Sequence, residues 1–320
     1  MERLTIDDLQ AAAAEWDAQV EKSAGIDHWC SATDWVLPLF ETWGHPPAVV
    51  LRDRDLGWAA FGWVDLSDGR ALVGLDPVWG FAAPLVGPDA GSLAEAVAAT
   101  LDDVMEWDAV FLSGLVRGGP MDRGVVAAFG RRHRLLAGAD SPRCVADLAD
   151  GAEAWWGRRS ERFRRNLRRA RAAASNAGLS LVVVDDDCPD AVVDRMGAVE
   201  STSWKGMEGS GIVEERMGSA YRRIARRLGA GGRMRACIAV LDGTDVGYVL
   251  GGVRGDTYRG LQISYAATLG HLSIGHLLQD HEVQRVAKEG ITRYDLGMDL
   301  EYKRRWADST EVTRTLVAVR

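Results

Sequence analysis

Hydrophobic and polar positions towards the end of the chain predict a strand, a helix and a second strand in succession. Residues 257–265 are rich in β-branched and aromatic side chains, which suit a pleated sheet. Apolar side chains then recur at roughly helical spacing, at Ile274, Leu277, Leu278, Val283 and Val286. We expect Ser273 to cap this helix, Gly290 to end it, and residues 291–296 to form a buried parallel strand.

The glycine-containing turn before this helix is a candidate anion-binding site. A strand that enters a helix through such a turn directs unpaired N–H groups outward, where the helix dipole favours phosphate or carboxylate. The turn is neither a Walker loop nor G-x-G-x-x-G, which disfavours nucleotide hydrolysis and dinucleotide binding. An ordinary strand–helix–strand crossover accounts for the spacing equally well. The candidate residues are Gly270, His271, Leu272, Ser273, Ile274, Gly275 and His276.

The first half of the chain predicts an α/β unit without an obvious catalytic constellation. Its pattern indicates helices over 7–20 and 92–105 and strands over 48–52, 57–64 and 109–113. The loop 76–84 contains Trp79 and Phe81 among Gly and Pro residues, and it either lines a pocket or is a packed connection. The basic cluster 131–134 is expected to be solvated surface.

The second half opens with an arginine-rich helix. Residues 158–171 contain eight arginines and one Glu, and an apolar stripe runs along Phe163, Leu167, Ala170 and Ala174. Arginine forks bind phosphates bidentately, so Arg165 and Arg169 are candidate contacts for a polyanionic ligand. The alternative is a solvated helix that docks by its stripe. Further elements are expected at 179–184, 190–201, 212–228, 235–241, 246–253 and 312–319, with a hairpin turn at 242–245.

Composition limits the class of protein. The 320 residues favour two domains, and 47% hydrophobic with 26% charged residues is ordinary for a globular protein. No apolar run is long enough for a membrane span, the N-terminus lacks a secretory h-region, and the four cysteines lack metal spacing. We therefore expect a cytoplasmic protein with reduced thiols. Residues 1–150 carry a net charge of −13 and residues 151–320 carry +5, so the second half is expected to meet an anion.

The order of elements and several short motifs resemble a known family. The motifs are Phe163 to Arg169, Glu200 with Trp204-Lys205-Gly206, Ser273 to Leu278, Asp295-Leu296-Gly297 and Tyr302-Lys303. In this order they resemble the GNAT-like acyltransferases of the CelD and BioF2-like group, which are related to the FemABX transferases. The chain departs from that pattern at Gly270-His271-Leu272, where an Arg or Gln is usual, and at Ile274, near which many relatives have Pro.

The resemblance implies an α/β fold of tandem GNAT-like (acyl-CoA N-acyltransferase) domains with mixed central sheets. Residues 1–150 would be a degenerate GNAT-like domain, and residues 151–320 would bind the acyl donor. The donor would be acetyl-CoA or another acyl-CoA, or aminoacyl-tRNA as in the Fem-type relatives. No metal is expected, because no second His lies at ligand spacing near a Cys.

Acyl transfer to an amine needs a proton acceptor, stabilisation of the acyl oxygen and protonation of the leaving group. The catalytic candidates for these tasks are Lys303, Asp295, Asp299, Glu200 and Tyr265, with Tyr302 as another possible acid. The substrate-binding candidates are Trp204, Lys205, Trp79, Phe81 and Tyr302. Each has a structural alternative. In these alternatives, Asp295 and Asp299 would cap a turn, and Lys303 would pair with a neighbouring carboxylate. Trp204 would belong to a core, and Lys205 would be exposed.

Three functions stay open from the sequence. The first is an acyl-CoA-dependent N-acyltransferase that acts on a small amine or an amino acid, and the acidity of the whole chain favours it. The second is an aminoacyl-tRNA-dependent, Fem-type transferase that forms amides, which the arginine helix favours. The third is a non-catalytic GNAT-like binding module.

Overall fold

The computed structural model describes residues 1–44 and 47–320, and the chain divides into two compact units. Unit 1 contains Met1–Pro142 and Val312–Arg320, and unit 2 contains Arg143–Glu311. These ranges differ at their ends from the expected 1–150 and 151–320. The reason is that the last strand, β13 (Ser309–Val319), pairs antiparallel with β6 (Ala109–Val116) in unit 1.

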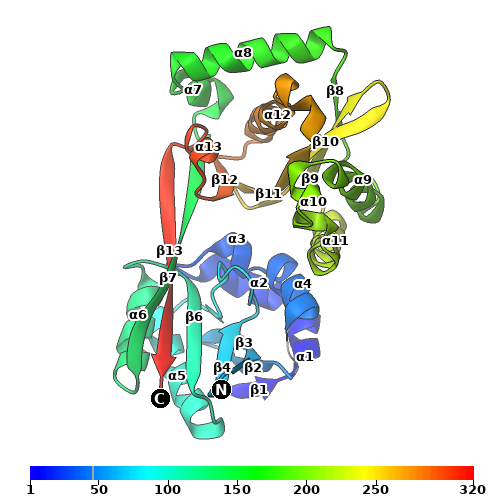
Figure 1. Cartoon of the computed structure of the whole chain (residues 1–320). Helices are drawn as coiled ribbons and strands as arrows, with labels where there is room; N and C mark the ends of the chain where they lie inside the picture. The colour runs from blue at the N-terminus through cyan, green and yellow to red at the C-terminus, as the bar shows by residue number, and fades with distance from the viewer. Residues whose placement is uncertain (45–46) are drawn as a thin grey trace. The chain divides into compact units, whose positions relative to one another are not determined.

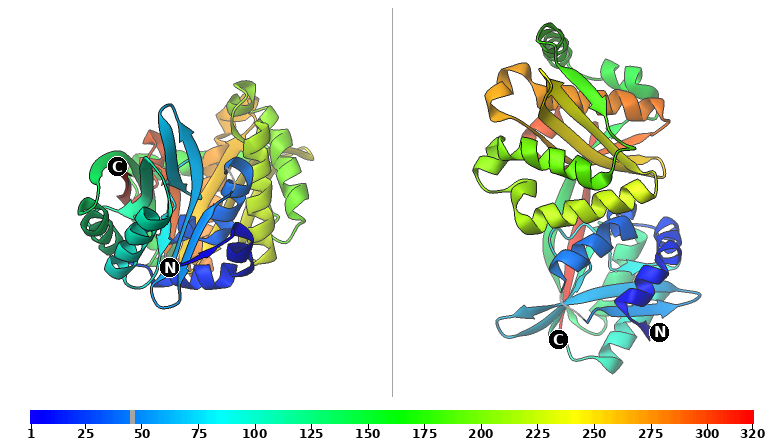
Figure 2. Two further views of the ribbon diagram at one scale, coloured as in Figure 1. Left: turned by 90° about the horizontal axis from the view of Figure 1, so that it is seen from below. Right: turned by 90° about the vertical axis from the view of Figure 1, so that its right-hand side faces the viewer.

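Unit 1 is a mixed sheet covered by helices on both faces (Figures 1 and 2). Its strand order is β1-β2-β3-β4-β6-β13, with β4 and β6 parallel and the other neighbours antiparallel. The strands not yet introduced are β1 (Glu2–Leu4), β2 (Val49–Asp53), β3 (Gly57–Leu66), β4 (Gly69–Gly74) and β5 (Leu85–Val86). The helices are α1 (Ile6–Ala11), α2 (Ala13–Lys22), α3 (His28–Ser31), α4 (Thr33–Trp43), α5 (Ala90–Val104) and α6 (Pro120–Gly130).

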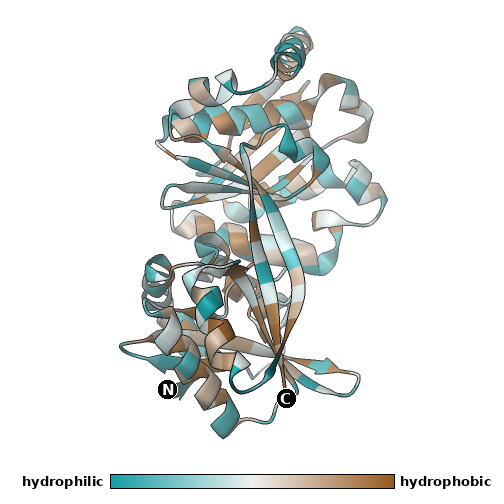
Figure 3. Cartoon of the chain, turned by 90° about the vertical axis from the view of Figure 1, so that its left-hand side faces the viewer, coloured by the Kyte–Doolittle hydropathy of each residue, from teal (hydrophilic) through white to brown (hydrophobic). Residues whose placement is uncertain are grey.

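Local sequence explains how the helices of unit 1 begin. Thr5 and Asp8 form a capping box at α1, and the side chain of Asp89 accepts N–H groups at the start of α5. The helix expected over 7–20 is interrupted at Ala12, which is non-helical at φ −98° and ψ 22°, so that prediction was wrong in its continuity. Apolar strand residues of this unit are buried, and Figure 3 colours much of its sheet as hydrophobic.

Unit 2 contains sheet strands of mixed direction in the order β7-β12-β11-β10-β9-β8. β11 and β12 are parallel, and the other neighbouring pairs are antiparallel. In Figure 1, α12 covers one face of this sheet and α9 with α11 covers the other. The strands are β7 (Arg134–Asp147, from Arg143 in this unit), β8 (Ser180–Val183), β9 (Met234–Leu241), β10 (Thr244–Arg254), β11 (Thr257–Tyr265) and β12 (Arg293–Met298). The helices are α7 (Gly151–Gly157), α8 (Glu161–Asn176), α9 (Pro189–Ser201), α10 (Trp204–Met207), α11 (Glu215–Ala230), α12 (Ile274–Lys288), α13 (Glu301–Arg304) and the 3₁₀ helices η1 (Gly211–Val213) and η2 (Ala267–Leu272).

The strand–helix–strand prediction is confirmed, as is the hairpin of β9 and β10. That hairpin turns at Asp242 and Gly243, with φ of 50° and 75°, as a two-residue turn of the twisted type requires. The expected helix 212–228 instead starts as η1 and continues as α11, because Glu214 caps a new helix there. Strand β7 and helix α6 were not predicted.

Strands β11 and β12 separate after the pair Arg259–Asp295, and Asp295 is one of the catalytic candidates. They pair at Thr257–Arg293, Tyr258–Tyr294 and Arg259–Asp295, although β11 continues to Tyr265 and β12 to Met298. Beyond these pairs the strands no longer follow one ladder. Side chains from neighbouring helices therefore have access to the space between them.

No helix in the described ranges 1–44 and 47–320 is long and apolar enough to cross a membrane. The predicted α/β class with mixed sheets is confirmed.

Candidate active site

A pocket of about 980 Å³ in unit 2 is a basic groove along α8. We call it the arginine groove. It lies between α8, the start of α12 and the segment 304–308. Its lining includes Arg158, Arg159, Arg162, Phe163, Asn166, Leu167, Arg169, His271, Ser273, His276, Arg304, Arg305, Trp306 and Asp308.

The arginines of the groove fall into two groups. Arg158 and Arg159 both bind Asp308, and Arg304 binds Asp299 through Nε at 2.7 Å. Arg162 and Arg169 are exposed and face the groove. Arg165, predicted together with Arg169, is exposed but is not among the lining residues that the structure describes.

An aromatic cluster supports the floor of the groove. Trp155 stacks on Trp306 at 5.6 Å between ring centroids, and Phe163 packs edge-on to Trp306 at 4.9 Å. The ring of His276 stacks on Trp306 at 5.8 Å. The predicted apolar stripe of α8 is thus confirmed: Leu167 is buried, and Phe163 packs against the core.

The start of α12 differs from the sequence expectation. Ser273 adopts the left-handed conformation (φ 56°, ψ 37°) and its side chain makes no cap, because it joins η2 directly to α12. Its carbonyl accepts N–H groups of His276 and Leu277. Gly270, His271 and Leu272 lie within η2, so their amides belong largely to a 3₁₀ helix. The first-turn amides of Ile274 and Gly275 are those that such a helix start presents to a ligand.

A second pocket, of about 420 Å³, adjoins the arginine groove. We call it the inner pocket. Ser273, His276 and Trp306 line both cavities, so the start of α12 forms their common wall. The inner pocket is otherwise lined by Trp204, Lys205, Ile263, Ser264, Tyr265, Gly270, Gly275, Gln279 and Tyr302. A Cβ at Gly275 would lie 3.1 Å from the Tyr265 ring, so glycine permits this close approach.

Trp204 and Lys205 lie on the short helix α10. Trp204 is 55% exposed, so the alternative that it belongs to a core was wrong. Lys205 is half-buried rather than exposed, and its Nζ donates to the carbonyl of Ile263 (3.0 Å) and to Oε1 of Gln262 (3.2 Å). Burial lowers the pKa of Lys205, and the charge of Glu200 opposes that shift.

Asp295 is held by two arginines at the point where β11 and β12 part. Its Oδ2 accepts from Nη1 of Arg259 (2.9 Å) and of Arg143 (2.5 Å), and its Oδ1 accepts the N–H of Gly297 (2.8 Å). Burial by itself raises the pKa of Asp295, but the charges of Arg259 and Arg143 outweigh burial and hold that pKa below its usual range. A carboxylate so engaged is a weak proton acceptor. Sequence reasoning missed both arginines, although a charged residue among the aromatic and β-branched residues of a predicted strand, such as Arg259, is a signal.

Lys303 reaches the same region from α13. Its Nζ lies 3.4 Å from where a Cβ of Gly297 would stand. Burial and the charge of Arg259 lower the pKa of Lys303 to about 8, and Lys205 contributes in the same direction. The neighbouring carboxylates Asp299 and Glu301 pair with Arg304 and Arg305 instead. Lys303 is not among the described lining residues of the inner pocket.

The remaining catalytic candidates occupy different environments. Asp299 binds Arg304 and accepts from Sγ of Cys144 (3.2 Å), which lowers its pKa. Glu200 is fully buried, and Tyr248 Oη donates to it at 2.9 Å. Tyr265 and Tyr302 line the inner pocket.

His276 is the one imidazole that lines both cavities within the described residues. Burial, followed by the charge of Arg305, lowers the pKa of His276. The imidazole is therefore neutral at pH 7 and able to accept a proton. Sequence analysis placed His276 only among donor contacts.

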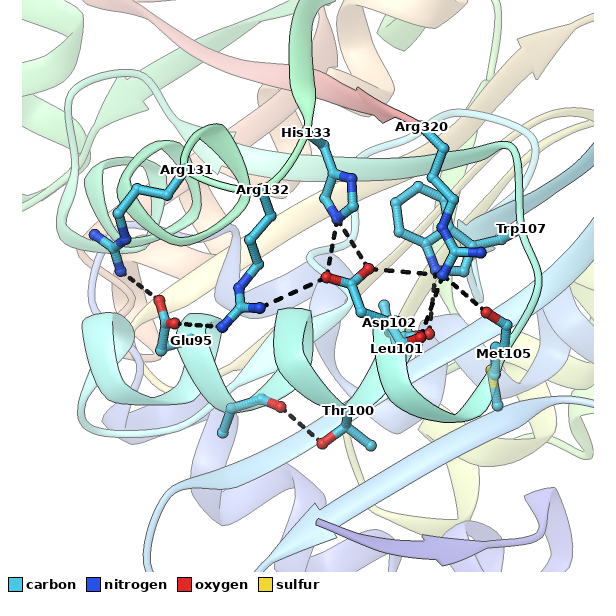
Figure 4. A network of polar contacts seen from close by, with 11 residues as sticks. Glu95, Thr100, Leu101, Asp102, Met105, Trp107, Arg131, Arg132, His133 and Arg320 are labelled. Atoms are coloured by element: carbon cyan, nitrogen blue, oxygen red, sulfur yellow. Dashed lines mark hydrogen bonds and ion pairs between the residues drawn. The ribbon is translucent and has the colours of Figure 1, made fainter.

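Two predicted features lie in unit 1. The Trp79 ring packs at a tilt against Trp35, with 5.1 Å between ring centroids, and the amides of Trp79 and Phe81 donate to the carboxylate of Asp76. This arrangement makes the loop a packed connection, and substrate binding by Trp79 and Phe81 stays a prediction. Figure 4 shows the basic cluster, in which Arg131 and Arg132 bind Glu95 on α5. His133, Arg132 and Arg320 gather around Asp102, so these side chains tie elements of unit 1 together.

One cluster in unit 2 has the composition of a metal site. Among the described residues, the ligand atoms of Cys237, His281 and Glu282 lie within 4.8 Å of one another. Arg285 already binds Glu282, with Nη2 to Oε2 at 2.6 Å, and burial raises the pKa of Cys237 to about 12. A guanidinium beside the carboxylate repels a cation, so these residues are a poor fit for a metal.

Comparison with known proteins supports a GNAT-like fold. Residues 161–304 match the family model of the acetyltransferase (GNAT) domain. The fold is similar to the crystal structure of FemX, with a TM-score of 0.71 and 12% identity over 100% of this chain and 98% of that chain. It is similar to the C-terminal domain of a putative lysylphosphatidylglycerol synthetase from Agrobacterium fabrum (TM-score 0.57, 11% identity, 97% and 91% covered). It is also similar to a tandem GNAT protein from the clavulanic acid biosynthesis pathway (TM-score 0.50, 13% identity, 99% and 97% covered). No curated protein matches the sequence.

Most lining residues of the arginine groove and of the inner pocket therefore lie within residues 161–304, the part of the chain that matches the acetyltransferase (GNAT) domain. The whole chain has the fold of tandem GNAT proteins, as predicted, and its structural neighbours agree with the predicted relation to the Fem-type group. At these identities the likeness to solved structures establishes the fold and leaves donor and acceptor to be argued from the site.

Proposed function

We propose that this protein is an N-acyltransferase that moves an acyl group from acyl-CoA to the amine of a small molecule or amino acid. The observation that carries the proposal is the junction of the two cavities. The arginine groove and the inner pocket share Ser273, His276 and Trp306 at the start of α12. A donor in one cavity and an acceptor in the other would meet at this wall.

The arginine groove suits the phosphates of coenzyme A. Arg162, Arg169 and His271 line it, and two of these side chains carry fixed positive charge. The first-turn amides at Ile274 and Gly275 and the dipole of α12 add further attraction for a pyrophosphate. At about 980 Å³ the groove lies at the upper end of ligand pockets, which suits a large donor.

The chemistry has one bond formed and one broken. The amine nitrogen attacks the acyl carbon, a C–N bond forms, the C–S bond of the thioester breaks, and the electron pair leaves with the sulfur. His276 accepts the proton that the amine loses, and a proton reaches the departing thiolate from solvent or from a tyrosine such as Tyr302. Lys303 supplies positive charge near the parted strands, where negative charge develops on the acyl oxygen.

The test is release of free thiol from acetyl-CoA and longer acyl-CoAs, measured with a panel of amines and confirmed by the mass of the amide product. We expect thiol release that depends on an amine. The variant His276→Asn should lose most of this activity, whereas Lys288→Met, an exposed position on α12, should retain it. Absence of amine-dependent thiol release with every donor would refute the proposal.

The exposed arginines of α8 favour a second candidate donor, aminoacyl-tRNA. Helix α8 carries Arg165 and Arg168 on its exposed surface in addition to the arginines of the groove, which is more positive surface than one pyrophosphate needs. Aminoacyl-tRNA would use that surface, and the reaction would again form an amide. Binding of aminoacyl-tRNA would then weaken steeply between about 50 and 200 mM salt, because each neutralised phosphate releases counterions. Weak binding without a salt slope would remove this alternative.

Binding of either donor without turnover would point to a non-catalytic module. We place the reaction in the cytoplasm, where both donors occur. The four cysteines are free thiols, which agrees with a reducing compartment.

A further inference from the structure

Lys205 is a cation in the wall of the inner pocket, and its ammonium group has one hydrogen-bond donor without a partner among the described residues. An ammonium group has three N–H donors, and two are directed at Ile263 and Gln262 of β11. The short helix α10 that carries Lys205 is fixed in place. Ser203 caps it, and a Cβ at Gly206 would lie 2.1 Å from the carbonyl oxygen of Glu200, so α10 packs directly on the end of α9. The lysine is therefore presented by rigid elements.

A buried hydroxyl lies on the same wall. Ser264 is 4% exposed and lines the inner pocket, yet its Oγ has no hydrogen-bond partner in the part of the chain that the structure describes. A buried polar atom without a partner costs free energy, on the order of 1–3 kcal/mol, unless a ligand or water satisfies it. Ser264 follows Ile263, whose carbonyl holds Lys205, so the hydroxyl and the ammonium group belong to one region of the wall.

The charge around this region is positive. The described lining residues of the inner pocket include no Asp or Glu. Of the carboxylates nearby, Asp295 is bound by Arg143 and Arg259, and Glu200 is the one whose negative charge acts on Lys205. Lys303 is a further cation nearby, and the charge of Lys205 contributes to lowering the pKa of Lys303. An anionic group on the ligand would relieve this excess.

The rest of the inner pocket is aromatic and small. Trp204, Tyr265, Tyr302 and Trp306 line it, and its volume of about 420 Å³ lies near the lower end of the usual range of ligand pockets, about 300–1,000 Å³. Its occupant is thus a small molecule with an apolar body.

We infer that the acceptor is an amino acid, or an amine of similar size that bears a carboxylate, with its carboxylate bound by Lys205 and Ser264 and its amine directed to His276. Lys205 lines only the inner pocket, whereas His276 lies on the wall shared with the donor groove. One molecule that reaches from Lys205 towards His276 would place its amine beside the acyl group. A charge-assisted hydrogen bond from an ammonium to a carboxylate is among the stronger polar contacts. This inference rests on the proposed function and specifies its acceptor.

The experiment compares each amino acid with its primary amide, which keeps the amine and the side chain and removes the negative charge. With acetyl-CoA as donor, we expect KM for the amide to exceed KM for the acid by at least tenfold. Lys205→Met should raise KM for the acid at least tenfold with kcat little changed, and it should leave KM for the amide nearly unaltered. Ser264→Ala should do the same to a smaller extent. Lys288→Met, which removes an exposed lysine from the same unit, is the matched control.

A binding measurement separates this inference from the proposed function. Titration calorimetry of amino acids and their amides into the protein, without any donor, should give tighter binding of the acids, and Lys205→Met should abolish that difference. If no acyl-CoA supports turnover but the acids bind more tightly than their amides, the carboxylate site is supported and acyl-CoA is excluded as the donor. If turnover occurs but acids and amides have equal KM and equal affinity, the carboxylate site is refuted and the transferase stands. If Lys205→Met does not fold, the comparison of acid and amide on the unaltered protein decides.

Discussion

The cluster of Asp295 with Arg143 and Arg259 gives the most direct test of how the site is built. The three side chains are 1%, 3% and 2% exposed, and Asp295 makes three hydrogen bonds through its two oxygens. Asp295→Asn keeps the shape but leaves one acceptor oxygen and adds an NH₂ donor that faces other donors. Two buried guanidinium groups then lose the charge of the Asp295 carboxylate. Breaking a buried ion pair from one side costs about 3–5 kcal/mol, a large share of the roughly 5–15 kcal/mol that stabilises a typical protein.

Chemical denaturation followed by circular dichroism measures this loss, and hydrogen exchange of β11 and β12 amides assigns it to unit 2. Asp242→Asn is the matched control, because it makes the same chemical change at an exposed turn where Asn suits a positive φ. A loss below about 1 kcal/mol for Asp295→Asn, equal to that of the control, would refute the reasoning. If such a stable variant had no activity, Asp295 would instead act as the catalytic base that its sequence position suggests.

Acid dependence provides an independent check on the same carboxylate. The folded-state pKa of Asp295 is lowered, so its contribution to stability is present above the unfolded-state pKa, near 3.9, and is lost as pH falls through the folded value. The unaltered protein should therefore lose more stability than Asp295→Asn between about pH 5 and the acid limit. Parallel pH profiles would contradict this expectation.

Three further predictions concern the reaction. Lys303→Ala should lower kcat at least about tenfold, roughly 1.4 kcal/mol of barrier, and an unchanged kcat would remove Lys303 from the mechanism. If the protonated lysine acts, the rate of the unaltered enzyme should fall as pH rises through about 8. In the unaltered enzyme, activity should fall as pH drops through the lowered pKa of His276, because only the neutral imidazole accepts the proton. His276→Asn should remove this acid limb of the pH–rate profile. A variant that keeps the limb would exclude His276 as the base. Arg169→Glu should raise KM for the donor more than Arg165→Glu, because Arg169 lines the groove, and equal KM values for the two variants would make the groove irrelevant to donor binding.

The sequence alone determined the local elements of unit 2. β-branched, aromatic and apolar residues set β11 and β12, and helical spacing set α12. The Asp242-Gly243 pair set the hairpin turn. These signals lie between residues that are close in the chain. The apolar stripe of α8 likewise predicted which face would pack, and its arginines predicted a positive surface. Local rules failed at Ser273, where the junction of two helices decided the backbone conformation.

Only the tertiary structure decided what the candidate residues touch. The sequence near Asp295 does not reveal its ion pair. Its partner Arg143 is 152 residues away in the chain and lies on the neighbouring strand β7. Lys205 binds a carbonyl 58 residues away on β11, and His276 of α12 stacks on Trp306 from the segment after α13. Such contacts arise when strands pair and helices pack, and no short stretch of sequence encodes their distances. The site therefore depends on long-range packing, whereas the elements that carry it depend on local pattern.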